Sequence, residues 1–149
     1  MINILVVDDD IAMTELTAML LRTRGFSAAT TNSARDAIRI VRETSPQAVI
    51  LDLMMPEMDG RDVCKAIREF SNTPIIILSA LNDPDIVASA LDGGADDYLV
   101  KPVPSDVLVA HINRFIKRTG RLRLRADAIS NAWARPLTAT APTGPLHPL

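Results

Sequence analysis

Residues 48–60 read AVILDLMMPEMDG: four apolar residues, then the carboxylate of Asp52, then a turn that contains Pro56 and Gly60. A short continuous apolar run is typical of a strand buried on both faces, as in a parallel sheet covered by helices. An unpaired carboxylate inside a core would cost several kcal/mol. Asp52 is therefore expected at the mouth of the sheet, where open α/β folds bind their ligands.

Strand-like and helix-like segments alternate along the first 118 residues. Strands are predicted at 4–7, 26–30, 48–52, 74–78 and 98–100. Helices are predicted between them, at about 12–24, 33–45, 61–70, 84–92 and 105–118. In the first helix, apolar residues repeat at helical spacing: Ala12, Leu16, Met19 and Leu20. Five alternating units predict an α/β fold with a five-stranded parallel sheet, flavodoxin-like strand order 2-1-3-4-5, and helices on both faces.

The composition is that of one ordinary globular domain. The 149 residues carry a net charge of −2, which gives no overall nucleic-acid signature. No apolar run approaches the roughly 20 residues of a membrane span, so we expect a cytoplasmic protein without a membrane partner. The single cysteine, Cys64, has apolar neighbours and is predicted to be a core residue.

The domain is expected at residues 1–119, and residues 120–149 differ from it in composition. A basic run from Lys117 to Arg125 precedes a stretch, 136–149, that has four prolines and no charged side chain. This composition predicts a flexible tail. The basic run fits either a solvated helix end or a nucleic-acid contact, and the role of Trp133 stays open.

Polar side chains follow four of the predicted strands. They are Asp8 and Asp9, Asp52, Ser79, and Lys101. Because the strands are parallel, these residues should meet at one edge of the sheet. Two carboxylates about 5 Å apart repel by about 3 kcal/mol at an effective dielectric near 20. Lys101 would offset part of this repulsion, and a divalent cation the rest. Mg²⁺ fits best, because it prefers oxygen ligands and keeps positions open for phosphate, whereas zinc would want His or Cys.

A carboxylate beside a metal ion, a lysine and a hydroxyl is suited to phosphoryl transfer. An Asp carboxylate can accept a phosphoryl group as a mixed anhydride, so Asp52 is the candidate nucleophile. The oxygens of the transferring group would be neutralised by Mg²⁺, by Lys101 and by the Ser79 hydroxyl.

Four motifs, in order, resemble the receiver domain of bacterial two-component response regulators (CheY-like). They are VVDDD at 6–10, LDLMMPEMDG at 51–60, LSA at 78–80 and GADDYLVKP at 94–102. The resemblance implies that Asp52 accepts a phosphoryl group from a sensor histidine kinase, a phosphotransfer protein or a small phosphodonor. It further implies Mg²⁺ bound by Asp9, Asp52 and the main-chain carbonyl of Met54, with Asp8 acting through water. Ser79 and Lys101 would hold the phosphoryl oxygens, and the Lys101-Pro102 peptide would be cis.

The resemblance also assigns Tyr98 as a switch residue. Phosphorylation would draw the Ser79 hydroxyl inward, the Tyr98 ring would fill the space, and the surface of helix four, strand five and helix five would change. The Tyr98 region is closest to the winged-helix (OmpR/PhoB-type) subfamily, although Val103 stands where that subfamily usually has Phe. Much of the subfamily's charged dimer surface is occupied here by Ile86, Val87, Ser89, Val107 and His111. A homodimer through this surface would therefore use a more apolar contact.

The sequence is compatible with two kinds of output from the receiver. The chain could be the receiver fragment of a DNA-binding transcriptional regulator, in which case DNA would be bound by a domain outside these residues. It could equally be a stand-alone receiver that acts by protein contact. An unphosphorylated interaction module is disfavoured, because every key position is filled. An Asp-nucleophile phosphohydrolase would need a second Asp at position 54, where Met54 cannot move a proton. We therefore expect a signalling protein, with at most slow autodephosphorylation, and not an enzyme.

Overall fold

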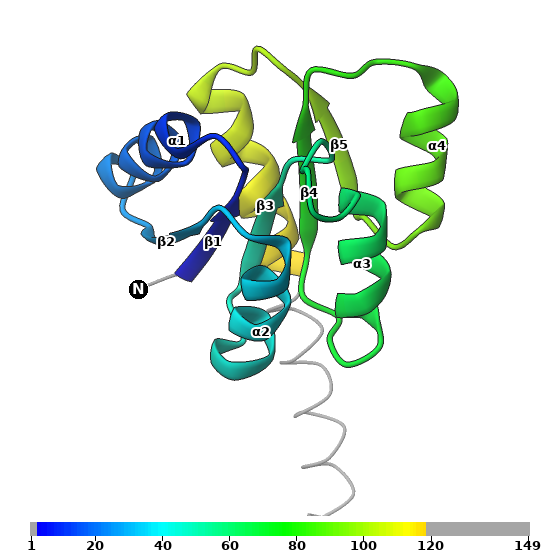
Figure 1. Cartoon of the computed structure of the whole chain (residues 1–149). Helices are drawn as coiled ribbons and strands as arrows, with labels where there is room; N and C mark the ends of the chain where they lie inside the picture. The colour runs from blue at the N-terminus through cyan, green and yellow to red at the C-terminus, as the bar shows by residue number, and fades with distance from the viewer. Residues whose placement is uncertain (1–2, 119–149) are drawn as a thin grey trace, which may run out of the picture. The chain divides into compact units, whose positions relative to one another are not determined.

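The computed structural model describes residues 3–118, and these form a five-stranded parallel sheet with helices on both faces (Figure 1). The strand order is β2-β1-β3-β4-β5, which confirms the predicted fold. The strands are β1 Asn3–Val7, β2 Ser27–Thr31, β3 Ala48–Leu51, β4 Ile75–Ser79 and β5 Asp97–Val100. The helices are α1 Ile11–Thr23, α2 Ala34–Thr44, α3 Gly60–Arg68 and α4 Pro84–Asp92, and residues 105–118 are helical as well.

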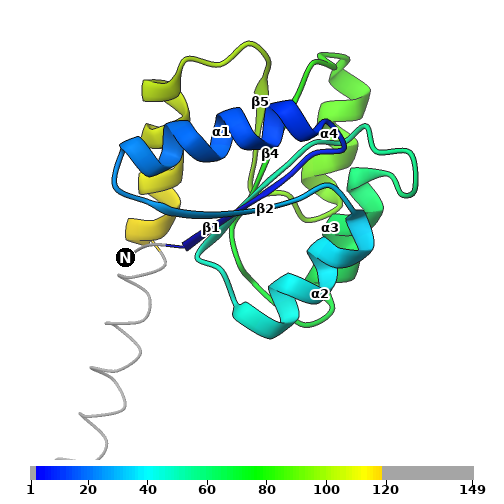
Figure 2. The same cartoon turned by 60° about the vertical axis from the view of Figure 1, so that its left-hand side comes forward.

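The three central strands are apolar on both faces, as a covered parallel sheet requires. One face packs with α2, α3 and α4, and its core includes Leu5, Val7, Val49, Leu51 and Ile77. The alternate strand residues, such as Ile4 and Ile76, are buried on the other face, over which α1 and helix 105–118 lie (Figure 2). Cys64 belongs to the first core and is fully buried, as predicted. Burial raises the pKa of its thiol to about 12.

Short polar side chains fix where the helices begin. Asp10, Ser33, Asp59 and Asp83 each accept a hydrogen bond from a main-chain N–H of the first turn. Such capping satisfies donors that the helix itself leaves free. Gly25, just after α1, has a φ of 90°, a left-handed conformation that glycine adopts without the steric cost of a side chain.

Helix α1 presents its apolar repeat to solvent. Its buried residues are Thr14, Thr17, Ala18 and Leu21, whereas Leu16 and Met19 are 50% and 59% exposed. The repeat of Ala12, Leu16, Met19 and Leu20 correctly predicts a helix, but it marks the outer face. Thr14 can be buried because its hydroxyl donates to the Ile11 carbonyl at 2.8 Å, so no polar group is left unpaired.

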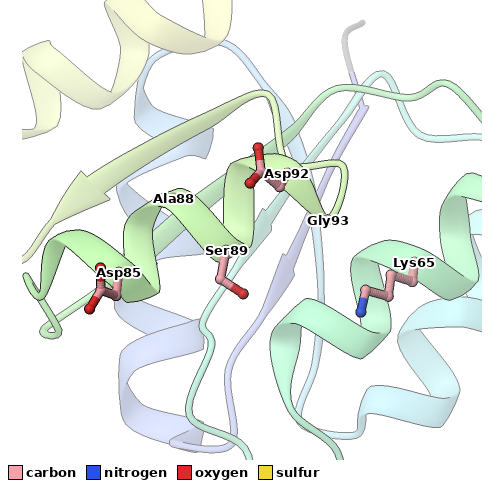
Figure 3. A pocket seen from close by; sticks show the side chains of 6 residues that line it. All are labelled: Lys65, Asp85, Ala88, Ser89, Asp92 and Gly93. Atoms are coloured by element: carbon pink, nitrogen blue, oxygen red, sulfur yellow. The ribbon is translucent and has the colours of Figure 1, made fainter.

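Helix α4 is held lightly. Ala90 is its only buried residue, and Arg61 Nη1 in α3 donates to Ser89 Oγ at 3.2 Å. A groove of about 480 Å³ lies between the two helices, and Figure 3 shows Lys65 of α3 across from the α4 side chains Asp85, Ser89 and Asp92. Few buried apolar contacts mean low local stability, so we expect α4 to be held less firmly than α1, α2 or α3.

Two expectations concern residues that the structure does not describe. The predicted tail at 120–149 and Trp133 lie outside the described residues, and so does the end of the predicted domain at 119. Within residues 3–118, no helix is both long and apolar enough to span a bilayer.

Candidate functional site

The parallel register brings the predicted site residues to one edge of the sheet. Val7 is paired with Leu51, and the Asp52 N–H donates to the Val7 carbonyl at 3.0 Å, so Asp8 and Asp52 follow side by side. Similarly, the Lys101 N–H donates to the Ser79 carbonyl at 2.8 Å. The predicted site residues, which stand at the C-terminal ends of β1, β3, β4 and β5, are thus neighbours in space.

Three carboxylates form a compact cluster at this edge. Oxygen atoms of Asp8, Asp9 and Asp52 all lie within 4.8 Å of one another. Lys101 Nζ bridges two of them, at 3.1 Å from Asp8 Oδ2 and 3.6 Å from Asp52 Oδ2. Asp8 is buried, Asp52 half-buried and Asp9 exposed, so the cluster opens to solvent on one side.

Main-chain amides orient the polar side chains. The Asp10 N–H donates to Asp8 Oδ1 at 3.0 Å, and the Met54 N–H donates to Asp52 Oδ1 at 3.2 Å. The fully buried Ser79 hydroxyl accepts from the Leu81 N–H at 3.2 Å. Ser79 therefore belongs to the same edge, but its hydroxyl is engaged with its own loop.

The pKa values of Asp52 and Asp9 are both raised. Desolvation raises the pKa of Asp52, and the charges of Asp8 and Asp9 add to this rise. The Met54 N–H and Lys101 oppose it by stabilising the carboxylate form. Partial desolvation, with hydrogen bonding and repulsion from Asp8, also raises the pKa of Asp9. Ionising the whole cluster is therefore unfavourable when only Lys101 balances it.

The donor set fits a hard divalent cation. All three convergent side chains are carboxylates, and neither His nor Cys belongs to the cluster. Mg²⁺ binds through one or two carboxylates and keeps further positions for water or phosphate. A doubly charged ion would also remove the repulsion that raises the Asp52 pKa. The Met54 carbonyl remains a predicted ligand.

The loop that follows Asp52 returns tightly beneath it. The Gly60 N–H donates to the Leu53 carbonyl at 3.0 Å. A Cβ at Gly60 would lie 2.7 Å from Leu53 Cα and 2.8 Å from the Asp52 carbonyl oxygen. Both are main-chain atoms, so only glycine permits this close approach.

Tyr98 reaches the loop that carries Ser79. Its hydroxyl donates to the Leu81 carbonyl at 2.6 Å, and its ring packs partly against the core. The Ser79 hydroxyl binds the N–H of that same residue, Leu81. The predicted switch residue and the predicted phosphoryl-binding hydroxyl are thus linked through one residue, Leu81, by its N–H and its carbonyl. The Lys101-Pro102 peptide is cis, as the resemblance implies.

Two further polar residues adjoin the site without having been predicted. Asn32 Nδ2 donates to the main-chain carbonyl of Asp8 at 2.8 Å, and a Glu57 carboxylate oxygen accepts from the Ala34 N–H. Nothing local in the sequence marks these contacts, because the partners are 24 and 23 residues apart.

The cavity at the carboxylate cluster is small, and the larger grooves lie beside the cluster. A cavity of about 10 Å³ lies among Asp8, Met13, Asp52 and Lys101. A groove of about 310 Å³ runs beside the site between the loops that contain Met54 and Leu81, with Arg61 and Ile86 among its lining residues. The groove of Figure 3 shares no residue with the carboxylate cluster.

Comparison with known proteins bears on this geometry. The sequence model of the family "response regulator receiver domain" matches residues 4–113, which include the whole carboxylate cluster. The chain belongs to the response regulator receiver family. The receiver domain from Clostridium thermocellum superposes with a TM-score of 0.77 at 33% identity, over 82% of this chain and 99% of that one.

Curated receiver-family relatives are regulators of gene expression. The DNA-binding response regulator MtrA of Mycolicibacterium paratuberculosis is 43% identical over 116 residues, or 78% of this chain and 52% of its own length. The transcriptional regulatory protein AfsQ1 of Streptomyces coelicolor is 40% identical over 119 residues, or 80% of this chain and 53% of its own. The chain thus spans about half the length of these relatives. They agree with the predicted nearness to the winged-helix subfamily.

The raised pKa of Asp52 predicts a gain in stability when its charge is removed. A carboxyl whose pKa is raised by folding stabilises the fold fully only below its unfolded pKa, near 3.8, and this stability is lost as the pH rises through the folded pKa. Asp52→Asn should therefore be more stable than the metal-free native protein at pH 7. Urea unfolding from pH 7 down to pH about 3.5 should show this difference fading.

The same measurement with MgCl₂ provides the control. The cation stabilises only a protein that binds it, so Mg²⁺ should narrow the gap between native protein and variant. A variant that is less stable than the native protein at pH 7, or a gap independent of pH, would contradict the assignment.

Proposed function

We propose that Asp52 accepts a phosphoryl group from the phosphohistidine of a sensor histidine kinase or phosphotransfer protein, or from a small phosphodonor. The observation that carries the proposal is the cluster of Asp8, Asp9 and Asp52 with Lys101 Nζ 3.6 Å from the Asp52 carboxylate. The family membership supports the same chemistry. A cytoplasmic location follows from these donors, which draw on the ATP and metabolites of the cell interior.

The residues divide the work of the transfer. A carboxylate oxygen of Asp52 attacks phosphorus, the bond from phosphorus to the donor's nitrogen or oxygen breaks, and the donor leaves with that electron pair. The Lys101 ammonium group would contact one phosphoryl oxygen, and the Ser79 hydroxyl would donate a hydrogen bond to another phosphoryl oxygen. Asp8, Asp9, Asp52 and the Met54 carbonyl would hold Mg²⁺, which when bound supplies positive charge to the transferring oxygens.

The acyl phosphate should persist, because position 54 offers no general acid or base for its hydrolysis. Met54, two positions after Asp52, cannot transfer a proton, and its side chain is 58% exposed over the loop. Slow autodephosphorylation at most is therefore expected. Such a lifetime suits a signal better than a catalytic cycle.

The phosphoryl group would act on the surface through Leu81. In this structure the Leu81 N–H occupies the Ser79 hydroxyl and the Leu81 carbonyl holds Tyr98. When Ser79 turns to the phosphoryl group, the Leu81 N–H would lose its partner, residue 81 would shift, and Tyr98 would be repositioned through the Leu81 carbonyl. The lightly held helix α4 follows this loop, so its position relative to β5 would change. This switch would bias an equilibrium that already exists.

The solvent face of α1 is the surface we assign to the kinase. Leu16 and Met19 are exposed there, and the helix begins directly after the acidic site, with Ile11 66% exposed. An apolar stripe on a helix fits the apolar face of a partner helix. A phosphohistidine must approach Asp52 closely, so a contact surface bordering the site is required.

A different surface is assigned to a second copy of the chain. Leu91 of α4, Val100 of β5 and Val107 of helix 105–118 are each about two-fifths exposed. His111 Nδ1 is 2.5 Å from Asp97 Oδ2 within the same chain. Asp97 therefore already has a partner and need not form an ion pair with a second copy. The homodimer through α4, β5 and helix 105–118 would therefore rest on apolar contact, as the sequence suggested.

The output we propose is control of transcription. MtrA and AfsQ1 are named as a DNA-binding response regulator and a transcriptional regulatory protein, and the chain matches about half of each. In this proposal the phosphorylated receiver acts on DNA only through a DNA-binding domain joined to it or contacted by it. Gel-shift assays on the full encoded gene product, with and without phosphodonor, test this directly.

Phosphorylation should depend on Asp52 and on Mg²⁺. Incubation with acetyl phosphate and MgCl₂ should add the mass of one phosphoryl group to the native protein and none to Asp52→Asn. Lys101→Ala should slow the reaction by about 10²-fold or more, because a charge aimed at the transferring oxygens is lost. Intact mass spectrometry over time, with EDTA as the metal-free arm, measures both effects. Labelling of Asp52→Asn equal to that of the native protein would refute the proposal.

The α1 surface should matter for the kinase and not for a small donor. Met19→Lys places a charge in the apolar stripe and should slow transfer from the kinase's phosphohistidine by about tenfold, the effect of losing roughly 1.4 kcal/mol of binding. Acetyl phosphate should label this variant at the native rate, because the site is untouched. Val107→Asp, on the other surface, is the matched control. Equal kinase transfer to Met19→Lys and to the native protein would remove α1 from the interface.

Dimer formation should depend on Val107 and not on Met19. Light scattering after phosphorylation should detect a dimer of the native protein and of Met19→Lys, whereas Val107→Asp should stay monomeric. The reason is that a desolvated, unpaired carboxylate in an apolar contact costs more than the contact gains. A phosphorylated Val107→Asp that dimerises as the native protein does would exclude this surface.

A further inference from the structure

The turn between β2 and α2 contacts both loops that carry the acidic site, although it supplies no site residue itself. On one side, Asn32 Nδ2 donates to the Asp8 carbonyl at 2.8 Å and to Thr14 Oγ1 at 3.1 Å. On the other side, Ala34 N–H, the first amide of α2, donates to Glu57. Residues 32–34 thus stand between the Asp8–Asp9 segment and the loop that follows Asp52.

The main chain of Asp8 is held at both of its ends, by Thr31 at the N–H and by Asn32 at the carbonyl. The Asp8 N–H donates to the Thr31 carbonyl at 3.3 Å, while the Asp8 carbonyl accepts from Asn32. Thr14, the second partner of Asn32, is buried in the first turns of α1. The direction in which Asp8 and Asp9 present their carboxylates is set by this short segment. Asn32 therefore holds the main chain from which those carboxylates project.

The Glu57 contact fixes the opposite loop. A carboxylate at the first amide of a helix is stabilised both by the hydrogen bond and by the helix dipole. Glu57 lies between the two ends of the tight loop that Gly60 closes against Leu53 and the Asp52 carbonyl. Anchoring Glu57 on α2 holds Met54 in its place relative to Asp52. Other parts of this segment are held by burial of Leu53 and Met55 in the core, so the Glu57 contact adds a tie to α2.

We infer that Asn32 and Glu57 are positioning residues that set the geometry of the acidic cluster for its cation from one shared turn, residues 32–34. Neither side chain lies among the candidate ligands. Each acts through the main chain of a loop that does carry them, as residues behind a metal site commonly do. The inference rests on the proposed Mg²⁺-dependent phosphorylation of Asp52 and adds the residues that tune it.

Mg²⁺ affinity is the property that tests this role. Asn32→Ala and Glu57→Ala should each weaken Mg²⁺ binding to the folded protein about tenfold, the usual effect of removing a group that orients metal ligands. Calorimetric titration with MgCl₂ measures this without any phosphodonor. Labelling by acetyl phosphate should slow at low MgCl₂ and recover at saturating MgCl₂, because the reacting groups are intact.

Two comparisons separate positioning from charge and from general stability. Glu57→Gln keeps an acceptor for the Ala34 N–H and should retain native affinity, whereas loss equal to that of Glu57→Ala would mean that Glu57 acts by charge and would overturn its positioning role. The double variant should lose less than the product of the single losses, since both contacts act through one turn. Asn72→Ala and Glu69→Ala, exposed residues at the other end of the sheet, are the matched controls.

The outcomes distinguish this inference from the proposed function. Native protein that binds Mg²⁺ and is phosphorylated, with Asn32→Ala and Glu57→Ala of native affinity, would overturn the inference alone. Equal weakening by Asn72→Ala and Glu69→Ala would overturn it too. Native protein that neither binds Mg²⁺ nor gains a phosphoryl group would overturn the proposed function itself. Both Asn32 and Glu57 are exposed, so their substitution leaves the core intact.

Discussion

Electrostatic repulsion at one edge of the sheet is the constraint on which the site depends. Parallel strands in register bring Asp8, Asp9 and Asp52 within 4.8 Å of one another. Only Lys101 Nζ, at 3.1 Å from Asp8 and 3.6 Å from Asp52, balances them among the described side chains. One positive charge against three carboxylates leaves net negative charge, and this repulsion adds to the desolvation that raises the pKa of Asp52. Such a cluster has the charge and the oxygen donors that a divalent cation prefers.

The residues that end the strands could be predicted because topology alone collects them. Once five strand and helix units alternate, right-handed crossovers make the strands parallel, and Asp52, Ser79 and Lys101 must share an edge. The strand order and the relation to receiver domains are confirmed. No local propensity was needed for these inferences, which is why they survive errors of one or two residues at the helix ends. Helix α3, for example, ends at Arg68 and not at Phe70.

Two features could not be read from the sequence, for different physical reasons. The outer face of α1 is apolar and part of its inner face is threonine, so hydrophobic periodicity alone points to the wrong side. Thr14 shows why the inverted pattern is stable, since its hydroxyl is satisfied within the helix. The contacts of Asn32 and Glu57 join residues far apart in sequence through exposed polar groups. Such contacts leave no period, spacing or motif to detect.

The light packing of α4 has a thermodynamic consequence. A helix with one buried residue loses little burial when it shifts to a neighbouring position, so we expect a small free-energy difference between such positions. Reversing a 1:99 ratio to 99:1 takes about 5.5 kcal/mol of differential binding, and smaller ratios take less. A few charge-assisted hydrogen bonds, at about 1.5–3 kcal/mol each, are of that size. The contacts that a phosphoryl group on Asp52 would make are thus comparable in free energy to the shift that the proposed switch of α4 requires.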